Sequence, residues 1–310
     1  MAAIGLAVFP FVVKDAFWQN VAVLTLIFAT AATAWAVLGG VAGQVSFGHS
    51  LFFSIGAYAT AYVVIHPAFS PWVGMAGGAL LAALVGTAVG FPVFRLRSHY
   101  FSIATIAMQQ VAFVVVTNTQ ELGEASGLPL PLRQPSLAAL QFSIRDKAEY
   151  YLVALCIFAA SLTLVWLVLR GPVGYYLRAI RDDEVAAQTL GVRARRYKLY
   201  AMALSAAITA FAGGYYAMYA LFVDPNIVLG VGFSILIALA AILGGAASLW
   251  GPLMGAALLV LLQQFTRTMY SGAGTGLDFV IYGILVMLIG IVEPRGLAGL
   301  AGRLRQRRRG

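Results

Sequence analysis

The longest strongly charged interval of this sequence lies between residues 170 and 200, in a chain that is otherwise mostly apolar. Long apolar runs flank the interval on both sides, so its charged groups must lie at the surface of whatever those runs form. Arginine, lysine and carboxylate side chains bind partners by charge and hydrogen bonding. This interval, the charged insert, is therefore predicted to be contacted by something outside a membrane. Its charged members are Arg170, Arg178, Arg181, Asp182, Asp183, Glu184, Arg193, Arg195, Arg196 and Lys198.

Helix-capping residues divide the charged insert into two short helices. Gly171-Pro172 places a proline in the first turn of a helix, where a missing amide hydrogen is tolerated. Asp182 and Asp183 can accept hydrogen bonds from the amides that begin a second helix, and Gly191 can end it in the left-handed conformation. A loop that only anchored the chain by its charge would not need these helix-capping residues. We therefore favour a docking element over the simpler interpretation, a positive loop that sets membrane orientation.

The other polar residues predict neither catalysis nor metal binding. His49, His66 and His99 are isolated from one another and from Cys156, and with one cysteine no disulfide can form within the chain. The sequence lacks a GxxxxGK[ST] segment, so we expect no ATP site of that kind here. Acidic residues fall at the ends of the apolar runs rather than inside them, which argues against a proton- or sodium-driven carrier. We expect the chain not to be an enzyme, with no catalytic residues and no metal.

The composition predicts an integral membrane protein with many spans. The chain is 61% hydrophobic and 10% charged, and its mean hydropathy is +0.89, whereas soluble domains carry roughly 25% charged residues. The apolar runs are long and continuous rather than alternating, which argues against a β-barrel. We predict an all-α polytopic fold with about nine or ten transmembrane helices, including broken or re-entrant glycine-rich segments.

We predict one transmembrane domain over residues 1–310. Residues 4–13 form a half-span or a short first helix. Further spans are expected at 21–38, 51–65, 72–94, 100–116, 150–169, 201–223, 227–243, 253–265 and 279–292. The polar parts that separate or follow them are a loop at 118–149, the charged insert at 170–200 and an arginine-rich tail at 294–310.

The distribution of basic residues predicts the orientation. If the spans alternate, fifteen of the 20 Lys and Arg residues fall on the side of the charged insert and the tail, and five fall on the other side. Because the basic side faces the cytoplasm, the insert and the C-terminus are predicted to be cytoplasmic and the 118–149 loop periplasmic. The N-terminus is inside only if residues 4–13 cross. The arginines of the tail are expected to bind anionic membrane lipids rather than nucleic acid.

Two glycine-rich interruptions predict the substrate path. Residues 39–58 and 244–252 place glycine and polar groups inside apolar regions, and irregular backbone at membrane depth occurs where protein or a water-filled cavity satisfies it. Paired interruptions in two halves of a chain also point to a transporter. The alternative is glycine-mediated helix packing, with Ser46 and His49 as interhelical hydrogen-bonding groups. The predicted path residues are Gly43, Gln44, Ser46, Phe47, Gly48, His49, Tyr58, Gly244 and Gly245.

These motifs resemble those of the permease subunits of bacterial branched-chain amino-acid ABC importers, over nearly the whole length. The segments that carry the resemblance are GQVSFGH at 43–49 with GAY at 56–58, YFSIAT at 100–105, RAIR at 178–181 with Ala186, Ala187 and Gly191, LSA at 204–206 with Ala212-Gly213, Gly244-Gly245 with Gly251-Pro252 and Gly255-Ala256, and PRGL at 294–297.

The resemblance implies a bacterial inner-membrane complex. Its partners would be a second related permease, two cytoplasmic ATPases that bind ATP and Mg, and a periplasmic solute-binding protein, with no cofactor in this chain. The family's coupling motif, Glu-Ala-Ala followed by three residues and then Gly, matches Ala186, Ala187 and Gly191, but Val185 stands where the Glu belongs. The implied coupling residues are Leu177, Arg178, Ala179, Ile180, Arg181, Asp182, Asp183, Glu184, Ala186, Ala187 and Gly191.

The cargo implied by the family is a branched-chain amino acid or a similar small polar solute. The outer loop reads GEASGLP at 123–129, where the family usually has a Thr-Gly-Gly run. This departure leaves urea, short amides and aromatic acids, which near relatives carry, as alternative cargoes. Two functions of other classes stay open, namely a stand-alone secondary carrier or facilitator and a membrane scaffold that transports nothing.

Overall fold

The computed structural model of the chain describes residues 9–10, 12–66, 70–96, 98–131, 147–269 and 296–299, with the single positions 6, 280, 283, 284 and 287. Five of the described helices are long and apolar enough to cross a membrane. They are α2 (Ala16–Ala36), which continues as the π-helical turn η1 (Val37–Val41), α4 (Pro71–Val93), α5 (Ser98–Thr117), α7 (Lys147–Arg170) and α10 (Ala194–Ala220). Three shorter apolar helices accompany them: α3 (His49–Ile65), α12 (Val231–Gly244) and α13 (Gly251–Met269).

The helical fold is confirmed, while the total of nine or ten spans stays a prediction. The segments expected to span at 4–13 and 279–292, and the tail at 294–310, lie largely outside the described residues.

The short elements lie between the long helices. They are the 3-10 turns η2 (Gln120–Leu122) and η3 (Glu124–Ser126), the helices α8 (Pro172–Asp182), α9 (Glu184–Thr189) and α11 (Pro225–Val228), and the strands β1 (Leu128–Pro129) and β2 (Phe222–Val223). The strands pair antiparallel, with Leu128 opposite Val223. They depart from the all-α prediction because two-residue strands leave no alternation to read in a sequence.

Three element boundaries differ from the sequence predictions. The helix expected to end at 38 continues through Gly39 and Gly40 as η1. The last part of the charged insert, from Ala194 onward, is the first part of α10. The span expected at 227–243 is divided into α11 and the 14-residue α12, which at 1.5 Å per residue is about 21 Å long and short of a full crossing.

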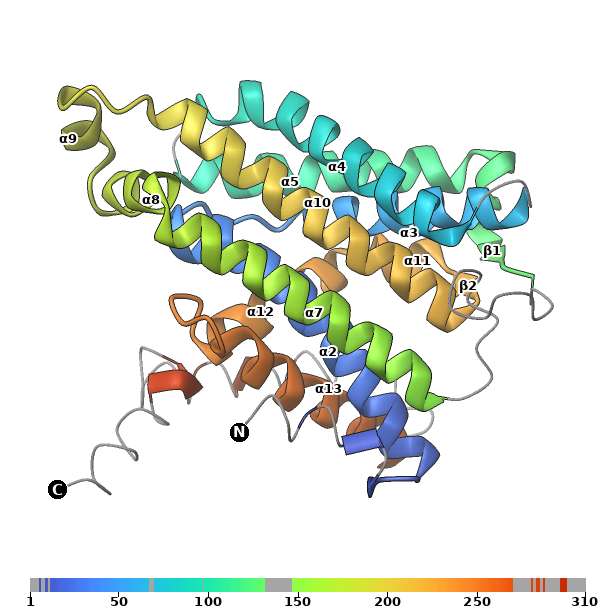
Figure 1. The fold of residues 1–310 in the computed structure, drawn as a ribbon. Coiled ribbons are helices and arrows are strands. Elements are labelled where there is room, and N and C mark those ends of the chain that lie inside the picture. The colour runs from blue at the N-terminus through green and yellow to red at the C-terminus, as the bar shows by residue number, and fades with distance from the viewer. Residues whose placement is uncertain are drawn as a thin grey trace, which may run out of the picture.

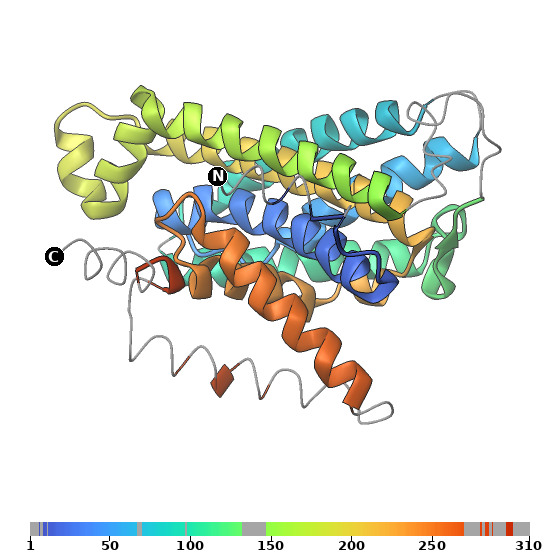
Figure 2. The same cartoon turned by 60° about the horizontal axis from the view of Figure 1, so that its bottom comes forward.

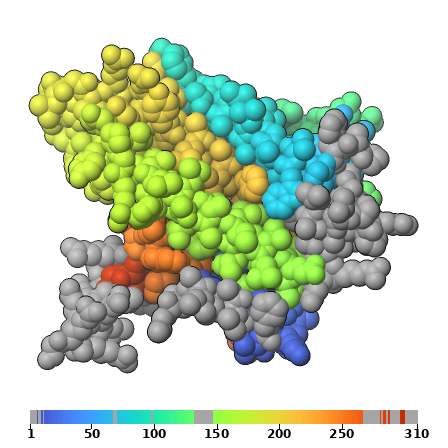
Figure 3. Space-filling view, viewed as in Figure 1, coloured from blue at the N-terminus to red at the C-terminus, as the bar shows by residue number. Residues whose placement is uncertain are grey.

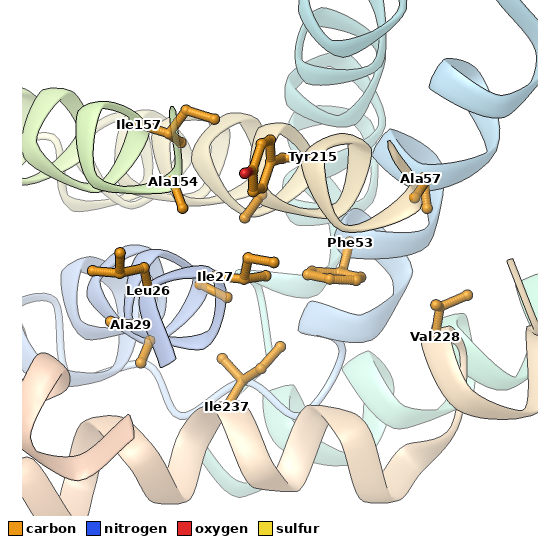
Figure 4. Close-up of a cluster of buried hydrophobic side chains, with 14 of the residues drawn as sticks. Leu26, Ile27, Ala29, Phe53, Ala57, Ala154, Ile157, Tyr215, Val228 and Ile237 are labelled. Atoms are coloured by element: carbon orange, nitrogen blue, oxygen red, sulfur yellow. The ribbon is translucent and has the colours of Figure 1, made fainter. Parts of the chain in front are cut away.

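The central helix, α10, packs against α2, α3 and α4. Gly213 of α10 lies against the carbonyl of Phe53 in α3, and Gly56 of α3 lies against the carbonyl of Ala210 in α10, so a side chain would fit at neither glycine. Such close backbone approach is how helices associate where no water drives them together. Figure 4 shows the apolar core beside this contact, with Phe53 and Tyr215 facing the side chains of α2.

The helices around α10 present apolar side chains outward. Leu80 and Leu84 of α4, Ile103 and Val111 of α5, and Leu167 of α7 are all more than half exposed, as expected for surfaces that meet lipid or other membrane helices. In Figure 3, α10 reaches the surface only as a narrow strip between α4 and α7.

The bundle has two different ends. Figures 1 and 2 both place α8 and α9 beyond one end, while β1 and β2 lie at the other. The described parts of the charged insert and of the 118–149 loop are thus on opposite ends, as the predicted orientation requires.

Candidate functional site

The two-helix form of the charged insert is confirmed. Gly171 is the N-cap of α8 and Pro172 its first residue. Asp183 caps α9, because its Oδ1 accepts a hydrogen bond of 2.9 Å from the Ala186 amide. Gly191 follows α9 with φ +86°, a left-handed conformation that glycine adopts without steric strain. Local capping therefore fixes the shape of α8 and α9, which we call the α8–α9 pair.

The inner faces of the α8–α9 pair form a small core of their own. Ile180 of α8 packs with Ala187 and Ala194 in this core, whereas the fully buried Leu177 belongs to the apolar core of the bundle. Two alanines at this point allow α8, α9 and the start of α10 to approach closely. The Ala187 side chain is therefore turned inward, where it helps to hold the pair together, and its role in coupling stays a prediction.

The outer face of the same pair carries large apolar side chains. Tyr175 is 70% exposed, Val185 71% and Leu190 86%. Val185 stands where the family motif has Glu, so the departure replaces a carboxylate with an apolar contact. Large apolar groups exposed on a surface appendage are typical of a site for a protein partner or a membrane. The sequence-predicted residues Arg178, Ala179, Arg181, Asp182, Asp183, Glu184, Ala186 and Gly191, in and beside the pair, are partly or fully exposed.

An ion pair fastens the α8–α9 pair to the bundle. The Lys198 Nζ of α10 donates a 2.7 Å hydrogen bond to the Glu184 Oε2 of α9. The lysine side chain is only 5% exposed and the glutamate 41%. A buried ammonium needs a counter-charge, so this contact ties the position of α9 to that of α10.

A second contact joins the α8–α9 pair to the interruption after α2. The Arg181 guanidinium donates through Nη1 to the carbonyl oxygen of Gly40 at 3.2 Å, and its other nitrogens bind Asp182. The Arg181 stem also lies against Gly43, which has φ +70°. The sequence placed Arg181 and Gly43 in separate sites, whereas the fold brings them into contact.

The broken helix predicted after α2 is confirmed, and its non-helical part is residues 42–48, the re-entrant segment. Its backbone is satisfied by neighbouring helices. Trp35 Nε1 donates to the Ser46 carbonyl at 2.7 Å, Ser102 Oγ to the Val45 carbonyl at 2.6 Å, and the Phe47 amide to Thr105 Oγ1 at 3.1 Å. Irregular backbone at membrane depth requires such partners.

His49 connects the start of α3 to α10. Its Nε2 lies 2.8 Å from Ser205 Oγ, and that hydroxyl donates its one hydrogen to the Ala34 carbonyl at 2.7 Å. Nε2 must therefore donate to Ser205, which leaves Nδ1 as an acceptor without a partner among the described residues. Both residues are fully buried, so the pair joins α3 to α10 inside the bundle.

In this conformation Ser46, Gly48 and His49 are buried, and Gln44 and Phe47 are partly exposed. The contact of His49 with Ser205 matches the interhelical alternative, whereas the Ser46 hydroxyl accepts a local hydrogen bond from the Gly48 amide at 3.3 Å. Tyr58 is also buried, and its hydroxyl has no partner among the described residues. Their role in a substrate path stays a prediction.

The second glycine interruption meets the first beside the α8–α9 pair. Gly40 lies against the Ala246 carbonyl, with no room for a side chain. Gly40 and Gly245 line a hollow of about 560 Å³, and a second cavity of about 180 Å³ reaches from Arg178 to Ser248. Gly244 is buried in the turn that ends α12.

Several partners in these contacts were missed by sequence reasoning. Thr105 and Ser102 hold the re-entrant segment from α5, Ser205 holds His49, and Ser234 Oγ accepts a 2.8 Å hydrogen bond from the Ser50 amide. These residues are at least 57 positions apart from their partners, so no local pattern could pair them.

A bundle of apolar helices with re-entrant backbone and an exposed two-helix appendage defines a polytopic membrane protein of the transporter class. The family described as branched-chain amino acid transport system / permease component matches residues 17–293. The chain belongs to this family, which confirms the resemblance seen in the sequence motifs.

Three relatives illustrate the match. The high-affinity branched-chain amino acid transport system permease protein LivM of Escherichia coli is 30% identical, over 96% of this chain and 73% of its own length. The probable LivM of Methanocaldococcus jannaschii is 25% identical, over 80% of this chain and 77% of its own. LivH of Salmonella typhimurium is 24% identical, over 88% of this chain and 91% of its own. No solved structure matches the chain.

Proposed function

We propose that this chain is the transmembrane subunit of a bacterial inner-membrane ABC importer. It carries a branched-chain amino acid or a similar small polar solute into the cytoplasm, powered by ATP that is hydrolysed on separate subunits. The observation that carries the proposal is the α8–α9 pair, whose outer face holds Val185 and Leu190 exposed beyond the bundle while ion pairing and burial fix its inner face. A rigid appendage with an apolar outer face is suited to receive force from a partner protein.

The contacts suggest how that force would enter the membrane part. Movement of the α8–α9 pair reaches α10 through the Lys198–Glu184 pair. It also reaches the end of α2 through the hydrogen bond from Arg181 to Gly40. The two interruptions meet at that point, so a shift there would displace the re-entrant segment relative to α5 and α10. Coupling of this kind requires an element with two arrangements that both sites bias, and we assign that role to the re-entrant segment.

The proposed complex contains a second related permease, two cytoplasmic ATPases that bind ATP and Mg, and a periplasmic solute-binding protein. The ATPases would contact the α8–α9 pair at the cytoplasmic end, where the C-terminus would also lie. The binding protein would contact the end that holds β1 and β2. The relatives named LivM and LivH are both permease proteins of branched-chain amino acid transport systems. This supports a complex in which two related permeases pair.

The docking role is tested with Val185→Asp and Leu190→Asp in the complex isolated from membranes. Each change places a charge on the apolar outer face, so the ATPase subunits should be lost on purification while the permease stays in the membrane. Thr189→Asp is the matched control, because Thr189 is also exposed on α9 but is not apolar, and among the described residues its hydroxyl bonds only the Ala186 carbonyl of the same helix. Retention of a fully coupled ATPase by both variants would contradict the role.

A second cargo class is favoured by one observation. The outer loop from Gly123 to Pro129 departs from the family's usual Thr-Gly-Gly run, and it is held in place because β1 pairs with β2. Urea, short amides or aromatic acids are the alternatives. Calorimetric titration of the periplasmic binding protein with each class separates them, and tight binding of leucine, isoleucine or valine alone would remove the alternative.

A further inference from the structure

The helix α5 has two chemically different faces. It is the least buried of the five long helices. Its inner face supplies Ser102 and Thr105 to the re-entrant segment, and the Gln109 amide donates to the Leu229 carbonyl. Its outer face consists of side chains that touch little of this chain: Tyr100, Ile103, Ala107, Gln110, Val111, Val114 and Val115.

Gln110 is a polar side chain on this largely apolar face, and lipid could not hydrogen-bond its amide. It is exposed and has no hydrogen-bond partner among the described residues. It lies seven residues from the end of α5 at Thr117, which is about 10 Å inside the span. An amide has two donors and an acceptor, and hydrocarbon satisfies none of them.

Two other outward-facing spans, α4 and α7, do not expose an unbonded amide in this way. The exposed side chains of α4 are all apolar or glycine between Val73 and Pro92. On α7 the exposed Thr163 satisfies its own hydroxyl, which donates to the Ala159 carbonyl at 2.7 Å. The contrast separates α5 from surfaces that meet lipid.

We propose that the outer face of α5 lines the solute route, opposite the second permease, and that the Gln110 amide hydrogen-bonds solute or water there. The proposal rests on the proposed function, because the route is completed by another subunit. The position of α5 supports the proposal, because the opposite face of this helix holds the re-entrant segment through Thr105 and Ser102. An amide suits a zwitterionic solute, because it can donate to a carboxylate and accept from an ammonium group.

The test measures what surrounds residue 110 in the complete complex reconstituted in liposomes. Cys156, the one cysteine of the chain, is first replaced by serine. A spin label is then placed at Gln110→Cys or, as the matched control, at Leu80→Cys on α4, which is 64% exposed. Collisions with a water-soluble nickel chelate and with oxygen, which concentrates in lipid, are compared.

We expect the nickel chelate to reach the label at 110 at least five times more effectively than the label at 80. Oxygen-dominated collisions at both positions would overturn the proposal, because α5 would then face lipid. A label at 110 that neither reagent reaches would also overturn it, because the face would then be a dry interface.

Transport by Gln110 variants gives a second measurement. Gln110→Leu should raise the KM for uptake about tenfold at unchanged membrane abundance, and Gln110→Asn should restore part of the loss. An unchanged KM in Gln110→Leu would contradict the solute contact. The collision measurement needs no ATP, so it can succeed even if the proposed function is wrong. If residue 110 is hydrated but the complex shows no ATP-driven uptake, the importer function is disproved and the water-filled face of α5 still holds.

Discussion

Replacing Glu184 by glutamine should loosen the α8–α9 pair from the bundle. The change removes the counter-charge of Lys198, whose side chain is 5% exposed. Loss of one partner from a fully buried pair costs about 3–5 kcal/mol, whereas loss from an exposed pair costs about 0–1 kcal/mol. Glu184 is 41% exposed, so we place the cost between these limits, at about 2 kcal/mol. That corresponds to a roughly 30-fold rise in the population of the detached pair.

Hydrogen exchange of the backbone amides between residues 184 and 192 measures this population directly. Asp182→Asn is the matched control, because it breaks the Arg181–Asp182 pair at 3.0 Å, whose members are 37% and 69% exposed. That change should raise exchange in the same amides by about fivefold at most. Removing both charges of the pair with Glu184→Gln and Lys198→Met should restore part of the protection. Equal effects of the two single variants would refute the reasoning that burial of Lys198 makes this contact important.

Three further substitutions test the packing. Gly213→Val should prevent stable insertion, because Gly213 lies against the backbone of α3. Gly77→Val should be tolerated, because nothing lies within 4 Å of that position. The amount of each variant in the membrane measures the difference. Ser205→Ala removes the partner of His49 and should destabilise the bundle by about 0.6–1.7 kcal/mol, measured by unfolding in detergent. Ala187→Arg should separate the α8–α9 pair and abolish ATPase binding without preventing insertion, and co-purification of a coupled ATPase with that variant would contradict it.

The elements that sequence predicted best are those with local causes. The caps of α8 and α9 depend on Gly171, Asp183 and Gly191, each of which acts within a few residues of its partner. The hydrophobic runs likewise located α4, α5 and α7 to within three residues at each end, because length and polarity alone decide whether a segment can cross a bilayer.

Glycine was a weaker guide to where a helix ends. Gly39 and Gly40 suggested that α2 ends there, yet the chain continues as η1, with the Ala42 amide donating to the Val37 carbonyl at 3.1 Å. The helical backbone ends only before Gly43, which requires a positive φ. Tertiary contacts decide this point, since close packing of Gly40 on Ala246 favours a continuous turn.

The candidate site depends mostly on contacts between distant residues. The hydrogen bond from Arg181 to Gly40 joins positions 141 residues apart, and the contact of His49 with Ser205 joins positions 156 apart. Sequence motifs indicated that 39–58 and 170–200 were both special, but no local pattern reveals that they touch. The burial of Ala187 was hidden for the same reason, because it depends on packing against Ile180 of α8 and Ala194 of α10.

Uptake of labelled solute into liposomes tests the central claim most directly. The complete complex is reconstituted with its binding protein on one side and ATP on the side of the α8–α9 pair, and the chain alone is reconstituted in parallel. The account predicts accumulation only in the complete complex, only with hydrolysable ATP, and not with Leu190→Asp. Solute carried by the chain alone, without ATP, would contradict it.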